Sequence, residues 1–424
     1  MRSASEAFII GSASTAIGKR PEDTFRDLAR EAYLGVLADA KLTDGRDIGN
    51  AWFGNCGMGT FGQRNIRGQV CFVPLVKEGL FPERVPMINV EGGCATGSMA
   101  LHGAWKDVLS GQVELALAIG VEKAFDPQGG AKTREIYEGG IDQLNPEEWQ
   151  RYYAAAGERA GKRFEVNSGG GTLFMDTYAM QAAYHMKRHG TTQRQIAMAA
   201  SKSHHFGSMN PLAQYRFEVS VDAVLQDRLI SYPLTRSMCA PVGDGAAAAL
   251  VCSRDFLEGQ PAAVRERAIR IRASVLSGGK YRDLNEPGLS MVAAAKAYQL
   301  AGMKPTDIDL AEVHDATSFG EIYQAEMLGF CAPGQGGPFV ESGATSLDGE
   351  IPMNLSGGLV SRGHPVAATG LSMIYELCLQ LRREGGPRQS AKSRVALAEN
   401  GGGVVGFDEA VCSVAILESS SSDG

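Results

Sequence analysis

The 424-residue sequence contains no apolar run of the roughly 18 residues that a membrane-spanning helix requires. Its eight cysteines include no CxxC pair, and no group of His and Cys has the spacing of a metal site. Scattered cysteines are typical of free thiols in a reducing compartment, so we expect a cytoplasmic, metal-free protein without membrane contact. The net charge of −7 also argues against a nucleic-acid-binding surface, although it leaves room for a local basic groove.

Glycine, in contrast, is abundant, and its 53 residues gather in short clusters that end apolar runs. Such clusters are typical of tight strand–helix connections in an α/β fold. Apolar runs at 113–123, 243–253 and 409–417 predict buried strands. The N-terminal stretch AFIIGSASTAIG is broken by glycine and serine, which favours a first strand over a signal segment.

Two parts of the chain are similar to one another. The segments that begin at Asn89 and Asn354 both read Asn-x-x-Gly-Gly, followed by a turn of small residues and an amphipathic helix. The Gly-rich turns before the runs 243–253 and 409–417 also correspond. This repetition predicts two similar α/β halves, and a chance likeness of Gly-rich turns is the alternative.

A long insertion separates the strand at 113–123 from the Gly-rich turn before 243–253, and insertions of this size often carry binding function. Its segments 145–165 and 176–190 predict helices, the second closed by Gly190. Its aromatic side chains either line a roomy pocket or form the core of the insertion, and core is the favoured interpretation. These aromatic residues are Tyr137, Trp149, Tyr152, Tyr153, Phe164 and Phe174.

Cys94, in the stretch NVEGGCATGSMAL, lies where a strand should give way to a helix. A thiol at a helix N-terminus faces unpaired amides and the positive end of the helix dipole, and both favour the nucleophilic thiolate. The small neighbours leave room for a substrate carbonyl and for backbone N–H groups directed at it. A nucleophile and a buried, inert cysteine are both compatible with this stretch alone.

Two histidines favour the nucleophile. His364 lies in the turn of the second half that corresponds to the Cys94 turn, so a pseudo-twofold axis would bring these turns together across a cleft. His314 follows an apolar strand, at the edge of the sheet where α/β sites gather. A thiol beside a base is the pattern of an activated nucleophile.

Five motifs make the chain resemble the thiolase family and, within it, the sterol-carrier-protein-x type. They are GGCATGSMAL (92–101), SKSHHFGSMNPLAQYR (201–216), SYPLTRSMCAPVGDGAAAA (231–249), HDAT (314–317) and GHP (363–365). Most thiolases have Asn-Glu-Ala-Phe at the HDAT position, whereas this subgroup has a His-Asp motif. The resemblance extends over nearly the whole chain.

The resemblance implies a thiolase-like α/β fold, in which two βαβαβαββ halves form five layers, αβαβα, with an inserted loop domain. We expect the N-terminal half at 1–123 and 232–258, the loop domain at 124–231, the C-terminal half at 265–418 and a tail at 419–424. The loop domain would cover coenzyme A, and the sequence does not rank its cations as phosphate ligands. These cations include Lys132, Arg134, Lys162, Arg163, Lys187 and Arg188.

The resemblance also implies a thiolase, an acyltransferase that cleaves a 3-oxoacyl-CoA with coenzyme A or runs the reverse Claisen condensation. We expect a degradative role on a bulky acyl-CoA. Cys94 would carry the acyl group, and His364 would take its proton and help to hold the enolate oxygen, with His314 beside it. The amides of Cys94 and Gly401 would form the oxyanion hole of the acyl-enzyme. Coenzyme A is then a co-substrate, and no bound cofactor is required.

One departure from the family concerns the group that moves the α-proton. The family's motif Cys-x-Gly-Gly-Gly here reads ENGGG, with Glu399 at the cysteine's place. Sterol-carrier-type relatives can use a cysteine in the His-Asp motif, but that position is Ala316. Three interpretations stay open: Glu399 is the acid/base, His314 or an unidentified group replaces it, or the carbon–carbon step is altered, as in a retro-aldol lyase or a non-catalytic partner.

Two further alternatives concern the class of the protein. One cysteine with two histidines is also the arrangement of decarboxylating ketosynthases, although the insertion and the Gly-His-Pro context argue against them. A thiolase-like scaffold subunit without activity is the alternative outside enzyme function. We expect a homodimer, no fused lipid-carrier domain and, as a further partner, a small zinc-ribbon/OB-fold subunit.

Overall fold

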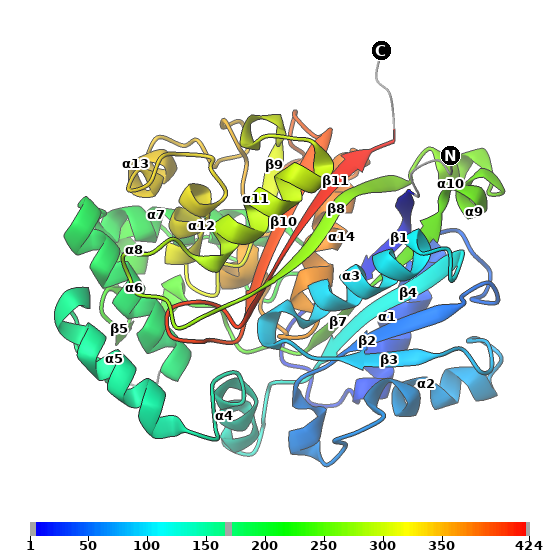
Figure 1. Cartoon of the computed structure of the whole chain (residues 1–424), viewed down its shortest axis with the longest axis horizontal. Coiled ribbons are helices and arrows are strands. Elements are labelled where there is room, and N and C mark those ends of the chain that lie inside the picture. The colour runs from blue at the N-terminus through cyan, green and yellow to red at the C-terminus, as the bar shows by residue number, and fades with distance from the viewer. Residues whose placement is uncertain (1–5, 166–171, 421–424) are drawn as a thin grey trace.

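The computed structural model describes residues 6–165 and 172–420 (Figure 1). The tail expected at 419–424 falls mostly on residues 421–424, outside this part of the chain. The predicted strands are present as β4, β7 and β11, which span Leu115–Glu122, Gly245–Ser253 and Val411–Ser419. The exact domain boundaries expected above remain a prediction.

The first half of the chain has the element order β-α-β-α-β-α-β-β. It consists of β1 (Ala7–Ser14), α1 (Phe25–Asp39), β2 (Asn50–Gly54), α2 (Arg67–Lys77), β3 (Met87–Val90), α3 (Thr96–Leu109), β4 and β7. Helix α1 begins where Thr24 and Asp27 form a reciprocal capping box, which satisfies two backbone donors of the first turn. This order is the predicted unit, interrupted between β4 and β7.

The second half repeats this order with one reduction. It consists of β8 (Ile269–Gly278), α11 (Leu289–Ala301), β9 (Leu310–Val313), α12 (Phe319–Met327), α13 (Gly336–Glu341), α14 (Thr369–Leu381), β10 (Val395–Gly402) and β11. The counterpart of β3 is a single parallel bridge between Ala311 and Met353. Two short helices, α9 (Arg254–Glu258) and α10 (Ala262–Arg265), connect the halves.

All of these strands form one sheet in the order β3-β2-β4-β7-β1-β8-β11-β10-β9. The halves meet at β1 and β8, which pair antiparallel only at Phe8–Arg270 and Ile9–Ile269. Four strands of the first half continue beyond β1, and three strands of the second half continue beyond β8. Because only two residue pairs join β1 to β8, the sheet consists of two half-sheets with a short junction.

The buried side chains show how the layers are stacked. On β4, Leu117 and Ile119 belong to a hydrophobic cluster with α1 and α2, whereas Ala116 and Ala118 belong to a second cluster with α3 and α14. This second cluster also takes up residues of β8, β10 and β11, so α3 and α14 lie between the half-sheets. A third cluster packs α11 and α12 on the outer face of the second half-sheet. The five layers αβαβα are therefore confirmed.

The insertion between β4 and β7 is mainly helical and lies along one side of the molecule (left in Figure 1). It holds α4 (Ala131–Glu138), α5 (Pro146–Ala160), α6 (Leu173–His189), α7 (Gln193–Met209), α8 (Val221–Gln226) and the hairpin β5 (Leu229–Ser231) and β6 (Leu234–Thr235). As predicted, Gly190 closes α6 in the left-handed conformation, with φ of 78°. The aromatic side chains named above gather in one hydrophobic cluster, and two of them, Tyr137 and Phe174, also line the cavity described below.

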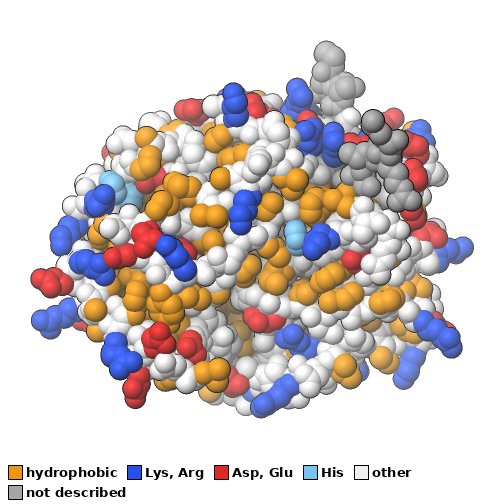
Figure 2. Space-filling model, viewed as in Figure 1, with side chains coloured by type: hydrophobic (Ala, Val, Ile, Leu, Met, Phe, Trp, Pro, Cys, Tyr) orange, Lys and Arg blue, Asp and Glu red, His pale blue; other side chains and the backbone are white. Residues whose placement is uncertain are grey.

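The charges on the surface are mixed. On the face that Figure 2 shows, Lys and Arg side chains alternate with Asp and Glu, and neither sign forms a continuous patch. In residues 6–165 and 172–420, no helix is both long and apolar enough to span a bilayer. All eight cysteines lie in this part of the chain, and none forms a disulfide.

Candidate active site

Cys94 lies in a single 3-10 turn, Gly93–Ala95, between the end of β3 and the start of α3. Gly93 has a φ of 56°, and a Cβ atom there would lie 2.6 Å from the backbone nitrogen of Gly403. The Thr96 hydroxyl donates to the Gly93 carbonyl at 2.7 Å and fixes the turn from within the helix. Only glycine fits at position 93, because the chain that follows β10 approaches it closely.

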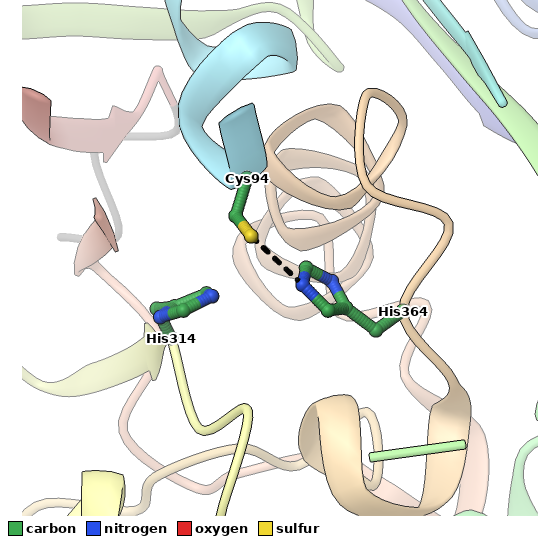
Figure 3. A group of neighbouring side chains, drawn as sticks. All are labelled: Cys94, His314 and His364. Carbon is green, nitrogen blue, oxygen red and sulfur yellow. Dashed lines mark hydrogen bonds between the residues drawn. The ribbon is translucent and has the colours of Figure 1, made fainter. Parts of the chain in front are cut away.

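His364 faces Cys94 from the corresponding turn of the second half, with its Nε2 atom 3.1 Å from the cysteine Sγ atom (Figure 3). Its Nδ1 atom lies 2.7 Å from the hydroxyl of Thr369, which itself donates to the Pro365 carbonyl at 3.0 Å. Because the Thr369 hydroxyl donates its proton to the Pro365 carbonyl, the hydroxyl oxygen accepts a hydrogen bond from Nδ1–H of His364. The imidazole therefore presents an unprotonated Nε2 atom to the thiol, which is the tautomer that a base requires.

A buried ion pair holds this turn against the strand that precedes the other histidine. Arg362, at the end of the π-helical turn Gly358–Arg362, lies 3.3 Å from a carboxylate oxygen of Glu312 on β9. The hydroxyl of Ser356 donates to the same carboxylate at 2.6 Å. The positions of His364 and His314 are thus coupled through one charged contact in the protein interior.

His314 follows β9 directly and points toward the same place (Figure 3). Its ring centroid lies 5.4 Å from that of His364. Its Nε2 atom is buried and has no hydrogen-bond partner among the described residues. A buried imidazole nitrogen without a partner is costly, so this atom is available to a ligand that reaches it, although His314 is not among the residues that line the cavity at Cys94.

The three side chains are electrically neutral at rest. Burial raises the pKa of the Cys94 thiol to about 12, although the amides of Cys94 and Gly403 act in the opposite direction. Burial also lowers the pKa of His314 to about 4 and that of His364 well below its ordinary value. The expected stabilisation of a resting thiolate by the helix N-terminus is thus outweighed by desolvation, and the thiol must lose its proton to His364 as substrate reacts.

Glu399 lies on β10, four residues before Gly403, but it does not line the cavity that leads to Cys94. Its carboxylate accepts the amide of His314 at 3.1 Å and the hydroxyl of Ser290 at 3.3 Å, and the thiol of Cys412 lies at 3.4 Å. Burial raises the pKa of Glu399 to about 8. The side chain faces α11 with Leu397, whereas Ala398 faces the middle layer. Its contacts hold the backbone of His314 in place.

The oxyanion amides of Cys94 and Gly401 remain a prediction, and the structure shows which amides approach the Cys94 sulfur. Gly401 lies within β10 opposite Cys412, and a Cβ atom there would meet the side chain of Glu409. The amide that approaches the Cys94 sulfur belongs to Gly403, because β10 continues to residue 402 before the chain turns past the cysteine. The Cys94 amide approaches its own sulfur as expected.

An open cavity of about 600 Å³ leads to Cys94 and His364, and we call it the active-site cavity. Ala316 and Val366 line it beside these two residues, and acidic side chains of α4 lie on its wall. Side chains that the motifs did not single out also line it: Cys56, Arg64, Arg134, Tyr137, Phe174 and Tyr178. Cys56 follows the end of β2 as Cys94 follows the end of β3, so its position after a strand could have marked it in the sequence. No motif marks Tyr178.

The same three side chains carry the donors of a soft-metal site. The Cys94 sulfur and one nitrogen each of His314 and His364 lie within 4.8 Å of one another. A thiolate and two imidazoles are ligands that zinc accepts. They are equally the groups that acyl transfer to a thiol requires.

Two family models match the chain: the thiolase N-terminal domain over residues 7–227 and the thiolase C-terminal domain-like model over residues 280–417. An acetyl-CoA acetyltransferase of Methanothermobacter thermautotrophicus is 34% identical over an alignment of 404 residues that covers 94% of this chain and 96% of that protein. Sterol carrier protein 2 of Bos taurus is 33% identical over an alignment of 431 residues that covers 95% of this chain and 73% of that protein.

Among solved structures, the fold is similar to that of the Ltp2-ChsH2(DUF35) aldolase. The TM-score is 0.77 at 21% sequence identity, and the match covers 98% of both chains. At this identity the likeness concerns the fold.

Proposed function

The chain belongs to the thiolase family and is an acyltransferase, and from this premise we propose that it cleaves a 3-oxoacyl-CoA with coenzyme A, or runs the reverse condensation, through an acyl group on Cys94. The observation that carries this proposal is the 3.1 Å contact between the Cys94 sulfur and an imidazole nitrogen whose tautomer is fixed by Thr369. A neutral thiol beside a neutral base forms a thiolate when a substrate carbonyl is present for the thiolate to attack.

In the first half-reaction, His364 takes the thiol proton and the Cys94 sulfur attacks the 3-oxo carbonyl. The carbon–carbon bond then breaks, which leaves an acyl-enzyme and the enolate of the departing acyl-CoA. The amides of Cys94 and Gly403, which both approach the sulfur, support an oxyanion hole for the acyl group. The unpartnered Nε2 atom of His314 supports a donor for the enolate oxygen, beside His364.

Coenzyme A is proposed to lie along the wall of the active-site cavity that the insertion forms. Of the six insertion cations named from the sequence, Arg134 lines this cavity. Lys162 is engaged by the buried carboxylate of Asp176, and Lys132 lies over the ring of Phe61. We therefore propose that Arg134, with Arg64, which also lines the cavity, binds the anionic part of the ligand.

A homodimer and a small partner subunit remain proposals. The outer edge of β3 is unpaired in the sheet, and none of its four residues is fully buried, which supports pairing with a second copy. The name of the structurally similar aldolase includes a DUF35 component, which supports the expectation of a small partner. Eight unpaired cysteines support a reducing, cytoplasmic location.

The test is the intact mass of the protein after mixing with a panel of 3-oxoacyl-CoAs that have aliphatic, aromatic and dicarboxylic acyl groups. We expect a mass increase that equals one acyl group, is absent from Cys94→Ala and disappears when free coenzyme A is added. EDTA in every sample keeps metal from blocking the three donors. No adduct with any member of the panel would contradict the proposal and favour a lyase or a scaffold.

A further inference from the structure

The proposed reaction requires a proton for the α-carbon of the departing enolate, and the chain lacks both cysteines that relatives use for this step. Glu399 and Ala316 occupy these positions. The Glu399 carboxylate is engaged by Ser290 and the His314 amide, and it does not line the active-site cavity. A proton donor that lines the cavity is therefore better placed than Glu399.

Tyr178 on α6 occupies the place next to Ala316. Its ring packs against a small apolar cluster formed by Ala316, Leu359 and Met373. It also lines the active-site cavity together with Cys94 and His364. The alanine methyl group leaves space that a cysteine side chain would fill in part, and the tyrosine ring reaches into this region from the insertion.

The hydroxyl of Tyr178 is free to act on a ligand. In the described part of the chain, no group forms a hydrogen bond with it, and the side chain is only half-buried. Burial raises the pKa of the Tyr178 phenol well above its ordinary value, and the charges of Cys94 and Glu409 raise it further. The phenol is therefore protonated at neutral pH, which is the state that a proton donor requires.

The other proton-bearing groups of the cavity are less suited. The Cys56 thiol is directed at the Thr96 hydroxyl, 3.2 Å away, and at the Gly93 carbonyl, 3.5 Å away. Tyr137 lines the cavity from α4 but does not belong to the cluster around Ala316. The matched control is Tyr184, a half-buried tyrosine of the same helix α6 that does not line this cavity.

We propose that Tyr178 is a further catalytic residue, the acid that protonates the α-carbon of the departing acyl-CoA enolate; this rests on the proposed thiolase function. When the carbon–carbon bond breaks, the electron pair stays on the α-carbon, and the Tyr178 O–H bond breaks to give it a proton. The His364 imidazolium returns its proton to the phenolate, and His364, neutral again, takes the proton of the incoming coenzyme A thiol. The resulting thiolate attacks the acyl-Cys94 thioester, and the cysteine sulfur regains its proton from His364.

This assignment separates two reactions that one enzyme catalyses. Exchange of labelled coenzyme A into acetyl-CoA requires only Cys94 and His364, because no bond to the α-carbon changes. Exchange of the α-hydrogens of acetyl-CoA in D₂O requires the α-carbon acid, as does cleavage of acetoacetyl-CoA. The probes are acetyl-CoA, acetoacetyl-CoA and isotopically labelled coenzyme A, followed by mass spectrometry.

For Tyr178→Phe we expect α-hydrogen exchange and cleavage to fall by about 10²-fold or more, while coenzyme A exchange stays within about threefold of the wild type. Tyr184→Phe should leave both reactions within about threefold. Unchanged α-hydrogen exchange in Tyr178→Phe would overturn the assignment, as would an equal loss of both reactions, which would indicate a merely structural ring. If the wild type shows no coenzyme A exchange that depends on Cys94, the proposed function itself fails.

Discussion

The turn that carries Cys94 and the turn that carries His364 begin with the same Asn-x-x-Gly-Gly pattern and lead into the two helices of the middle layer. Their surroundings differ. The Cys94 turn follows the half-exposed edge strand β3 and opens onto a cavity of about 600 Å³. The His364 turn is buried throughout and is held by the Arg362–Glu312 ion pair.

This difference assigns separate tasks to two related pieces of chain. The nucleophile must meet substrates of varied shape, so its turn faces the cavity and is fixed mainly by contacts within its own helix start. The base must keep one tautomer and one distance, so its turn is embedded in the core and anchored by charge. Four changes test this division, and the largest effect is expected first.

Replacement of the base should cost the most. In His364→Gln, no other side chain of the described residues forms a hydrogen bond with the Cys94 thiol and can take its proton, so we expect the rate of acyl transfer to fall by roughly 10³-fold. The alkylation of Cys94 by iodoacetamide at pH 7 should slow in parallel. His205→Gln removes an exposed histidine of α7 and should leave both rates unchanged. Near wild-type transfer in His364→Gln would show that another residue is the base.

The anchor of the buried turn is tested by Arg362→Met. The change leaves the Glu312 carboxylate buried and unpaired, so we expect the free energy of unfolding to fall by about 3–5 kcal/mol in urea titrations. The matched control is Arg194→Met, which removes an exposed ion pair with Asp222 and should cost less than about 1 kcal/mol. Equal, small losses in both variants would show that packing alone holds the His364 turn.

The pH dependence of stability tests the neutral state of His314. Its folded pKa of about 4 lies below the unfolded value near 6.5, so the unfolded chain binds a proton first as the pH falls. The stabilisation is fully present above pH 6.5 and is lost toward pH 4. Between pH 7 and pH 4, the wild type should lose about 3 kcal/mol more unfolding free energy than His314→Gln. Parallel curves for the two proteins would mean that His314 is not held neutral.

The open side of the Cys94 turn should show the smallest effect. Arg134 lines the cavity, and no acidic side chain in the described residues pairs with it. For Arg134→Ala we expect the KM for coenzyme A to rise about fivefold with kcat nearly unchanged, because the contact is equal in ground and transition states. Added salt should weaken binding to the wild type more than to the variant. Arg163→Ala, an exposed cation of the same insertion that does not line the cavity, should behave as the wild type.

Glu399 shows what the sequence leaves undecided. The strand period of two places Val395, Leu397 and Glu399 on one face of β10 and Ala396 and Ala398 on the other. The sequence contains this alternation but does not reveal which face borders the active site. The same limit applies to the oxyanion amide, because the length of β10 decides whether Gly401 or Gly403 passes the cysteine.

The sequence by itself determined the two α/β halves, the strand–turn–helix site of Cys94 and the matching turn of His364. These features depend on local patterns, such as glycine pairs, apolar periods and helix starts, that are complete within a few residues. Only the tertiary structure decided the protonation states, the amide that reaches the sulfur and the tyrosine that packs on Ala316. The reason is physical: desolvation and close contact depend on segments distant in the chain, and no local pattern encodes which of them meet.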